Sequence, residues 1–165
     1  MKYLSYVWFF AFSVLTLTSC SKESVDELET ANLTTKVSPV HYTSIELEIL
    51  DRVNDYRDQN GLPQLASLDE GSRQAAYHND HMIESEEVCH DDFAYRYTAL
   101  VNAEKAKAVS ENVAFGYSSA EAVVKAWIAS DGHRENMLGD HTHFGISVKE
   151  GKDSRLYFTN IFVRK

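Results

Sequence analysis

Cysteine is scarce in this sequence, with two copies in 165 residues, Cys20 and Cys89. Cys20 closes an apolar N-terminal segment, so Cys89 is the single thiol of the remaining chain. One cysteine excludes an intrachain disulfide and a zinc site built from several thiolates. Because His90 follows it directly, a Cys–His nucleophile pair is one interpretation. Sequence neighbours rarely adopt that geometry, and we favour the alternative that Cys89 is a small, buried apolar residue.

Basic character is lacking as well. The chain has 16 Lys and Arg against 25 Asp and Glu, a formal net charge of −9 and a pI near 5.2. Without a basic stripe or a run of Lys and Arg, nucleic acid is excluded as a partner. A metal ion or a cationic ligand is easier for such a chain to accommodate. With two prolines and 44% hydrophobic residues, the composition indicates one globular domain with terminal extensions.

A long apolar run occurs only at the N-terminus, where Lys2 precedes the segment Tyr3–Leu17. At about 15 residues it is shorter than the ~20 residues of a spanning helix and is typical of a signal peptide. The small residues before Cys20 resemble a bacterial lipobox. This resemblance predicts that residues 1–19 are a lipoprotein signal peptide and that the Cys20 thiol is lipidated. The alternative is an ordinary secretory signal cleaved near Cys20.

Residues 20–42 are expected to be the lipidated cysteine and a flexible tether, because the segment is polar, acidic and without periodicity. Several acyl chains on Cys20 would anchor the protein stably to a membrane. Ser21-Lys22-Glu23 is weakly similar to a surface-export signal of Gram-negative lipoproteins. We therefore expect a protein of the bacterial cell envelope that is anchored to a membrane through Cys20 and faces the periplasm or the exterior. Of the bacterial membranes, we favour the outer membrane.

The rest of the chain, residues 43–165, has the periodicity of one domain in which helices come first and a β-hairpin comes last. Apolar positions at helical spacing predict helices over residues 44–59, 68–85, 93–106 and 120–130. We expect a further short helix to begin near His133, capped by Asp131. Strands are predicted over residues 111–116, 144–149 and 156–163, with one face buried in the second and both faces buried in the third. The third strand should therefore be central in its sheet.

Motifs of well-defined enzyme classes are missing. The chain has neither the HExxH arrangement of zinc proteases nor a G-x-S-x-G nucleophile elbow. His78 and His81 lie three residues apart on one helix face, where we expect a polar, solvated surface rather than a metal site.

Three polar residues are candidates for one site: His90, Glu111 and His133. Glu111 opens an apolar segment, where a buried carboxylate needs a partner. His133 is expected at a helix start, which lowers the pKa of an imidazole. The alternatives are a structural hydrogen bond for Glu111 and core packing for His133. Because 21 and 22 residues separate the three, only the fold could bring them together.

Six short motifs in order resemble the bacterial CAP domains, of the superfamily of cysteine-rich secretory proteins, antigen 5 and pathogenesis-related proteins. They are Asn54-Asp55-Tyr56-Arg57 with Gly61-Leu62-Pro63, Ala75–Met82, His90-Asp91-Asp92-Phe93 with Arg96, Ser110–Ala114, Trp127 with Gly132–Leu138, and Phe144-Gly145-Ile146. The resemblance covers residues 43 to 165. It implies an α/β fold, a three-layer α/β/α sandwich with a central, mainly antiparallel sheet.

Members of that superfamily gather two His and two Glu in an exposed cleft, which in several cases holds a divalent cation. Matched motif by motif, the resemblance implies His90, Glu111 and His133 as cleft and metal-binding residues here. The fourth, acidic position falls at or near Ser130, so one carboxylate is missing. Two imidazoles and one carboxylate remain a reasonable set for zinc if water completes it.

Three functions follow from these features. The first is an envelope-anchored binding module for a lipid, an envelope polymer or a protein, assisted by a divalent cation such as zinc. The second is a hydrolase that uses a metal-bound water or Glu111 as general base. The third is a structural protein in which the polar cluster only holds loops together. We rank binding first and catalysis last, and no catalytic residue is assigned.

Overall fold

The structure, a computed structural model, describes residues 38–165. The predicted signal peptide, the lipidation site at Cys20 and most of the predicted tether lie outside these residues. No helix between residues 38 and 165 is long and apolar enough to cross a bilayer.

The predicted helices and strands are present, with shifted ends. The elements are α1 (Ser44–Gln59), β1 (Ala66–Ser67), α2 (Asp69–Ser85), α3 (Phe93–Glu104), β2 (Ala108–Phe115), α4 (Ala120–Ala129), α5 (Asp131–Leu138), β3 (His143–Glu150) and β4 (Leu156–Arg164). β2 begins three residues earlier than predicted, because residues 108–110 pair with residues 162–164 of β4. β1 was not predicted, since two residues carry no periodicity.

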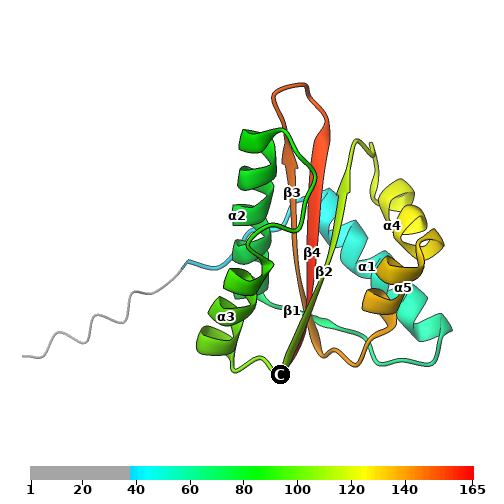
Figure 1. Cartoon of the computed structure of the whole chain (residues 1–165). Coiled ribbons are helices and arrows are strands. Elements are labelled where there is room, and N and C mark those ends of the chain that lie inside the picture. The colour runs from blue at the N-terminus through cyan, green and yellow to red at the C-terminus, as the bar shows by residue number, and fades with distance from the viewer. Residues whose placement is uncertain (1–37) are drawn as a thin grey trace, which may run out of the picture. The chain divides into compact units, whose positions relative to one another are not determined.

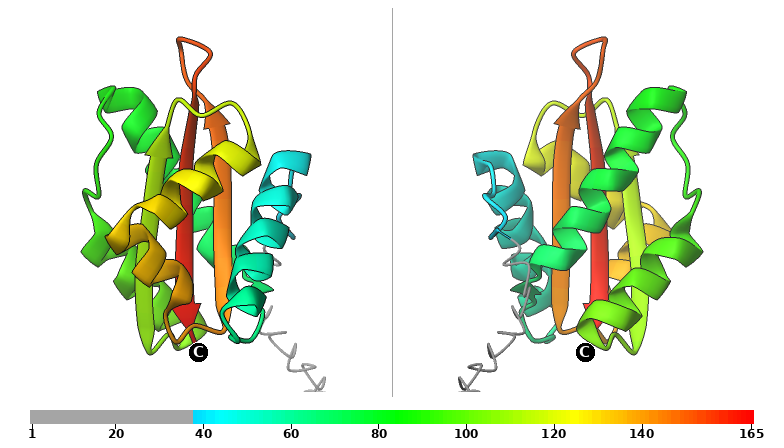
Figure 2. Two further views of the ribbon diagram at one scale, coloured as in Figure 1. Left: turned by 90° about the vertical axis from the view of Figure 1, so that its right-hand side faces the viewer. Right: turned by 90° about the vertical axis from the view of Figure 1, so that its left-hand side faces the viewer.

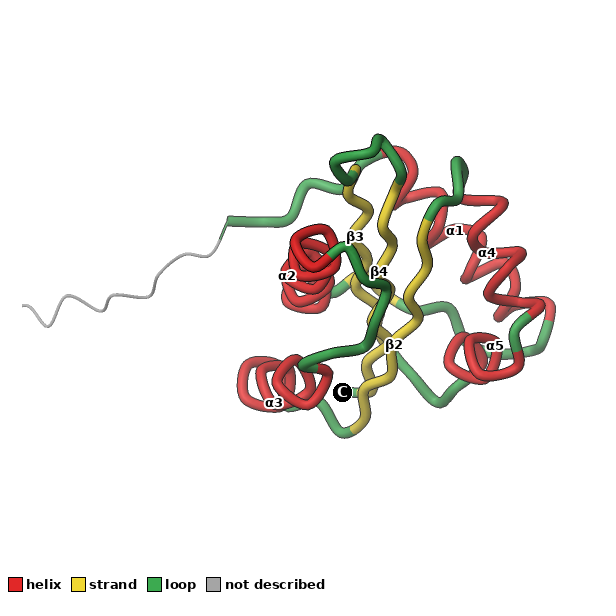
Figure 3. Tube along the Cα trace, turned by 45° about the horizontal axis from the view of Figure 1, so that its top comes forward, coloured by secondary structure: helices red, strands yellow, loops and turns green. Residues whose placement is uncertain are grey.

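The elements form three layers (Figure 1). The sheet has the strand order β1-β3-β4-β2, in which only the β1–β3 pair is parallel. α2 and α3 cover one face, and α1, α4 and α5 cover the other (Figures 2 and 3). The expected α/β/α sandwich with a mainly antiparallel sheet is thus confirmed. β4 is central, as its two apolar faces predicted, and β2 is an edge strand.

The main core lies between the sheet and α1, α4 and α5. Its largest side chain is Trp127, which is 1% exposed and donates a hydrogen bond from Nε1 to the carbonyl of Val113. Phe158 and Phe162 of β4 face this core, whereas Ile161 and Val163 face α2 and α3. Both faces of β4 therefore contribute to the hydrophobic core.

The prediction of one buried face for β3 was wrong, since residues 144–147 are all buried. α2 covers the second face so closely that Gly71 packs directly against Gly145. Polar groups on this face are paired: Asn79 Nδ2 donates to the Ser147 carbonyl at 2.8 Å, and its Oδ1 accepts from Thr159. The two glycines and this asparagine let a strand without large side chains on one face be covered by a helix.

Two local expectations are corrected by the chain geometry. Asp131 does not cap α5, because α4 runs into α5 with Ser130 as the shared junction and Asp131 as the first helical residue. The Asp131 carboxylate pairs instead with Arg134, at 2.6 Å. The end of the predicted tether is also in contact with the domain: Val40 donates to the Asp69 carboxylate, and the Tyr42 hydroxyl bonds to the Ser72 hydroxyl.

The Gly71–Gly145 contact predicts a steep cost for one methyl group. In Gly145→Ala, the new Cβ would overlap the backbone of Gly71 and Ser72, so α2 must move off the sheet. We expect a loss of about 3 kcal/mol or more in the free energy of unfolding, at the upper end of overpacking effects. Urea unfolding measures the loss.

Gly132→Ala is the matched control, because a Cβ at that position of α5 meets nothing within 4 Å. It should leave stability unchanged or raise it by up to about 1 kcal/mol through helix propensity. Equal stability of the two variants would contradict the close packing of α2 on β3.

Candidate functional site

The candidate site is built around the edge strand β2, where Glu111 and Asn112 are neighbours in sequence. Successive side chains of a strand point to opposite faces of its sheet. Glu111 accordingly points to the layer of α2 and α3, and Asn112 to the layer of α5. Glu111 bonds to the loop that carries His90, and Asn112 bonds to the helix that carries His133, on opposite faces of the sheet.

Glu111 is a buried carboxylate with three donors. Its side chain is 2% exposed. Arg96 of α3 donates from Nε to Oε2 and from Nη2 to Oε1, both at 2.8 Å. His90 Nδ1 lies 2.8 Å from Oε1, and His78 Nε2 lies 3.8 Å from the same oxygen. The carboxylate is therefore paired in the geometry that a buried charge requires.

These partners decide the charge of Glu111. Burial by itself raises the pKa of its carboxyl, but the hydrogen bonds from His90 and Arg96 outweigh burial, and the pKa lies below its ordinary value. Glu111 is thus an ionised hydrogen-bond acceptor at neutral pH. A buried carboxylate held in this way is poorly suited to accept a proton as a general base.

His90 is oriented by this contact. Its side chain is 55% exposed while the carboxylate behind it is buried. Because an ionised Glu111 only accepts, we assign the proton to His90 Nδ1. The Nε2 atom then carries the free electron pair of the exposed ring. A carboxylate behind a histidine is the arrangement that fixes the tautomer of metal-binding imidazoles.

His133 reaches the same strand from the other layer. Asn112 Nδ2 donates to the His133 carbonyl at 2.9 Å, and Asn136 Nδ2 donates to the Glu111 carbonyl and to Asn112 Oδ1. The pKa of His133 is lowered, first by burial and then by repulsion from His90. Ser130 and His133 line one pocket of about 280 Å³. Ser130 is the position at which the resemblance places the missing acid.

The structure brings the three predicted residues together only in part. His90 and Glu111 are in direct contact, whereas His133 lies across β2. Among residues 38–165, donor atoms of three His, Cys, Asp or Glu side chains come within 4.8 Å of one another at one place, and His90, Glu111 and His133 are not that group. Any cation at this edge would be held by the imidazoles, with Glu111 behind His90.

Comparison with known proteins agrees with the order of the motifs and with the layers of the fold. The family described as the cysteine-rich secretory protein family (CAP) matches residues 50–163. The chain belongs to this family.

Two bacterial relatives are similar to this chain in sequence. The membrane protein YlbC of Bacillus subtilis is 31% identical over 130 residues, which are 74% of this chain and 35% of YlbC. The protein YkwD of the same organism is 30% identical over 123 residues, 71% of this chain and 47% of YkwD. The chain thus spans between a third and a half of the length of these relatives.

Solved structures show the same fold. An outer surface protein of Borrelia burgdorferi superposes with a TM-score of 0.66 at 18% identity, over 76% of this chain and 98% of its own. An extracellular protein with an SCP domain from Bacillus anthracis gives a TM-score of 0.63 at 27% identity, over 72% of this chain and 40% of its own. Both of these proteins are named for an extracellular or surface location.

Two neighbours of Glu111 were not predicted from their chemistry. His78 was expected on a solvated face, and this was wrong: it is 1% exposed, and its Nε2 bonds to the Cys89 carbonyl at 2.9 Å. Burial lowers the pKa of His78, despite the opposing effect of Glu111.

Arg96 was noted only as part of a motif. Arg96 lies four residues before the buried Leu100, as His78 lies four before Met82, and this helical spacing was the available signal.

The ion pair of Arg96 with Glu111 predicts a large effect of one substitution. Arg96→Met keeps the apolar stem but leaves the buried carboxylate with histidine partners only. Removing one member of a buried pair costs about 3–5 kcal/mol. Thermal and urea unfolding should show this loss in the CAP domain.

Lys152→Met is the matched control, because Lys152 and Glu86 form a pair in which the two side chains are 67% and 71% exposed. Exposed pairs contribute little to stability, so this variant should unfold like the parent. A fully stable Arg96→Met variant would mean that Arg96 does not compensate the charge of Glu111.

Proposed function

We propose that this protein is a membrane-anchored, extracytoplasmic CAP module that binds a macromolecular ligand of the cell envelope, with a divalent cation at the edge of β2. The observation that carries the proposal is the exposed ring of His90, held from behind by the buried Glu111. A histidine that serves the fold alone has no need for an ordered and solvent-facing nitrogen.

The cation would be held by His90 and His133. Imidazole nitrogens suit zinc, and water completes a site with few protein ligands. Glu111 would position His90 rather than bind the metal, because both carboxylate oxygens already accept from Arg96. When bound, the cation would supply a Lewis acid that attracts an oxygen of the ligand. Ser130 in place of an acid favours an exchangeable cation over a permanent one.

The two pockets beside His133 and His90 are small, which favours a ligand that contacts the surface at these two histidines. The pocket beside His133 measures about 280 Å³ and the one beside His90 about 240 Å³, both below the ~300–1,000 Å³ of sites that enclose small molecules. A third pocket of about 420 Å³, which Tyr77, His78, Tyr95 and Arg96 help to line, lies within that range and adjoins the Arg96–Glu111 pair. Tyr77 and Tyr95 are 65% and 74% exposed, and exposed tyrosines are common where a protein contacts a polymer or another protein.

The location rests on the N-terminal sequence and on the relatives. Lipidation of Cys20 would leave the domain on a tether at the membrane, facing the periplasm or the exterior. YlbC is named a membrane protein, and the structural neighbours are named as outer surface and extracellular proteins. These names support a location of this chain at the outside of a membrane as well.

A hydrolase is less well supported, because Glu111 is ionised, buried and fully bonded. A purely structural role is favoured by the hydrogen bonds that join Asn112, Asn136 and Glu111 across β2. That network accounts for Glu111 and for the His133 backbone, but not for the exposed ring of His90. Binding therefore remains the function that uses each of the three predicted residues.

Zinc titration by calorimetry tests the cation. The full chain with Cys20→Ser, in detergent, is compared with the same chain carrying His90→Ala and His133→Ala. We expect a saturable zinc component that the double variant lacks while its circular dichroism is unchanged. His41→Ala, in which an exposed histidine is removed, should keep that component.

The ligand is tested on the same proteins, immobilised and incubated with solubilised envelope fractions. The parent should retain an envelope component with zinc present and release it with a chelator, and the double variant should retain none. Equal retention by parent and double variant would contradict a role of His90 and His133. Identical zinc isotherms for the folded parent and the folded double variant would contradict the metal site at His90 and His133.

A further inference from the structure

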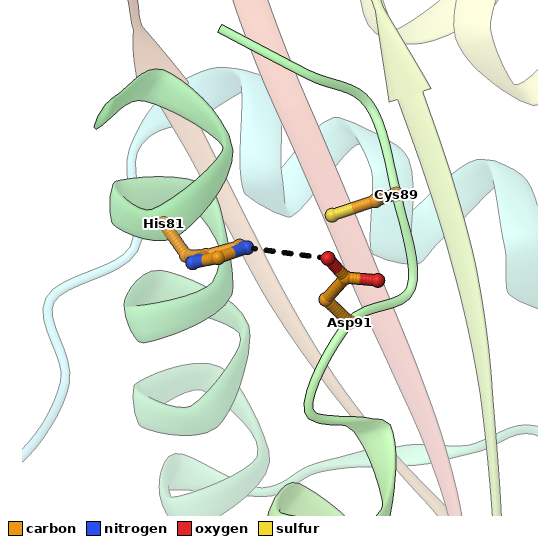
Figure 4. A group of neighbouring side chains, drawn as sticks. All are labelled: His81, Cys89 and Asp91. Atoms are coloured by element: carbon orange, nitrogen blue, oxygen red, sulfur yellow. Dashed lines mark ion pairs between the residues drawn. The ribbon is translucent and has the colours of Figure 1, made fainter. Parts of the chain in front are cut away.

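A group of side chains with the chemistry of metal ligands lies on the other side of the loop that carries His90. His81 of α2 faces Cys89 and Asp91 of the loop between α2 and α3 (Figure 4). One donor atom from each of the three lies within 4.8 Å of the other two. His81 Nε2 and Asp91 Oδ2 are 3.9 Å apart. None of these residues belongs to the set of His90, Glu111 and His133.

The alternation of side chains along the loop separates the two groups. His90 points to Glu111, while Cys89 and Asp91, one residue on either side, point to His81. The loop therefore presents His90 in one direction and the pair of Cys89 and Asp91 in the other.

The loop is fixed at both residues that carry donor atoms. His78 Nε2 bonds to the Cys89 carbonyl at 2.9 Å, and Arg96 Nη1 donates to the Asp91 carbonyl at 2.6 Å. His78 and His81 are also stacked, with ring planes 13° apart. Buried side chains therefore hold the backbone of this loop in place. The three donor atoms can come closer together by rotation of their side chains alone.

Thiolate, imidazole and carboxylate together form a donor set that zinc prefers and that magnesium and calcium do not. Tetrahedral zinc with bonds of about 2.0–2.3 Å puts its ligands roughly 3.3–3.7 Å apart. The donors, which all lie within 4.8 Å of one another, are at most roughly 1.5 Å beyond that spacing. The His81 and Asp91 side chains are 42% and 69% exposed, so they are free to close by rotation.

The local charge favours a cation. Between residues 84 and 92 the sequence reads ESEEVCHDD, with five acidic residues in nine. Clustered carboxylates raise the local concentration of divalent ions before any ligand binds. The acids alone do not select a metal. The thiolate and the imidazole do, because they are softer ligands than carboxylates.

We propose that His81, Cys89 and Asp91 form a zinc-class site with an open fourth position, separate from the cation site at His90 and His133. Cys89 is partly buried against Met82, Val113 and Tyr157, in line with the small apolar residue expected from the sequence, and the proposal gives its thiol a second role. The proposal is independent of the proposed function, because it uses other residues, with a thiolate among the donors.

Cobalt substitution tests it, since only a site that contains Cys89 gives a sulfur-to-cobalt charge-transfer band. The full chain with Cys20→Ser, in detergent, has Cys89 as its single thiol. We expect Co²⁺ to produce the charge-transfer band with tetrahedral d–d bands, and Zn²⁺ to displace them. Cys89→Ser should abolish the charge-transfer band, and the His90→Ala/His133→Ala variant should keep it.

Two further variants decide whether the three residues act as a site or the thiol binds alone. His81→Ala and Asp91→Asn should each weaken Co²⁺ binding by about 10-fold or more, given that even indirect partners of a metal contribute that much. His41→Ala should leave it unchanged. Absence of the band in the parent, or full affinity in both His81→Ala and Asp91→Asn, would overturn the proposal. Circular dichroism checks that each variant is folded.

Discussion

The structure depends on one buried charge at an exposed edge. Glu111 lies on β2, the edge strand, yet its side chain is 2% exposed. Burial of a carboxylate is costly unless donors surround it, and Arg96 and His90 supply them. To do so, α3 and the loop before it must pack over the edge of the sheet. The loop then places His90 at the surface, and it places Cys89 and Asp91 against α2 at the same time.

Asn112 makes the same kind of connection on the opposite face. It binds the His133 backbone and, through Asn136, joins α5 to the strand. Two neighbouring residues of β2 thus hold the two layers of helices in register at the site. At this edge strand, Asn136 also donates to the backbone carbonyl of Glu111. In this CAP domain the residues that define the site and the residues that close the fold are the same.

Most of the fold was predictable from the sequence, because α1, α2, α4 and the β3–β4 hairpin have regular apolar spacing and clear ends. The burial of His78 was missed although its spacing from the buried Ala75 and Met82 was a signal, because an imidazole is more often solvated and its neighbour Glu111 is brought there only by tertiary structure. Likewise, β3 has small and polar residues on the face that α2 covers, and its burial depends on the Gly71–Gly145 contact and on the hydrogen bonds of Asn79, which are tertiary. His90 and Glu111 were predicted by motif, but their direct bond, the role of Arg96 and the meeting of His81 with Cys89 depend on tertiary structure.

The central claim is that the buried Glu111 accepts from His90 Nδ1 and leaves Nε2 free at the surface. Long-range ¹H–¹⁵N NMR of the full chain with Cys20→Ser, recorded at about pH 9 where imidazoles are neutral, measures this tautomer directly. The account predicts that His90 carries its proton on Nδ1 and has an unprotonated Nε2. A His90 ring protonated on Nε2 would contradict it, because Glu111 would then have no donor from His90 and the exposed nitrogen could not bind a cation.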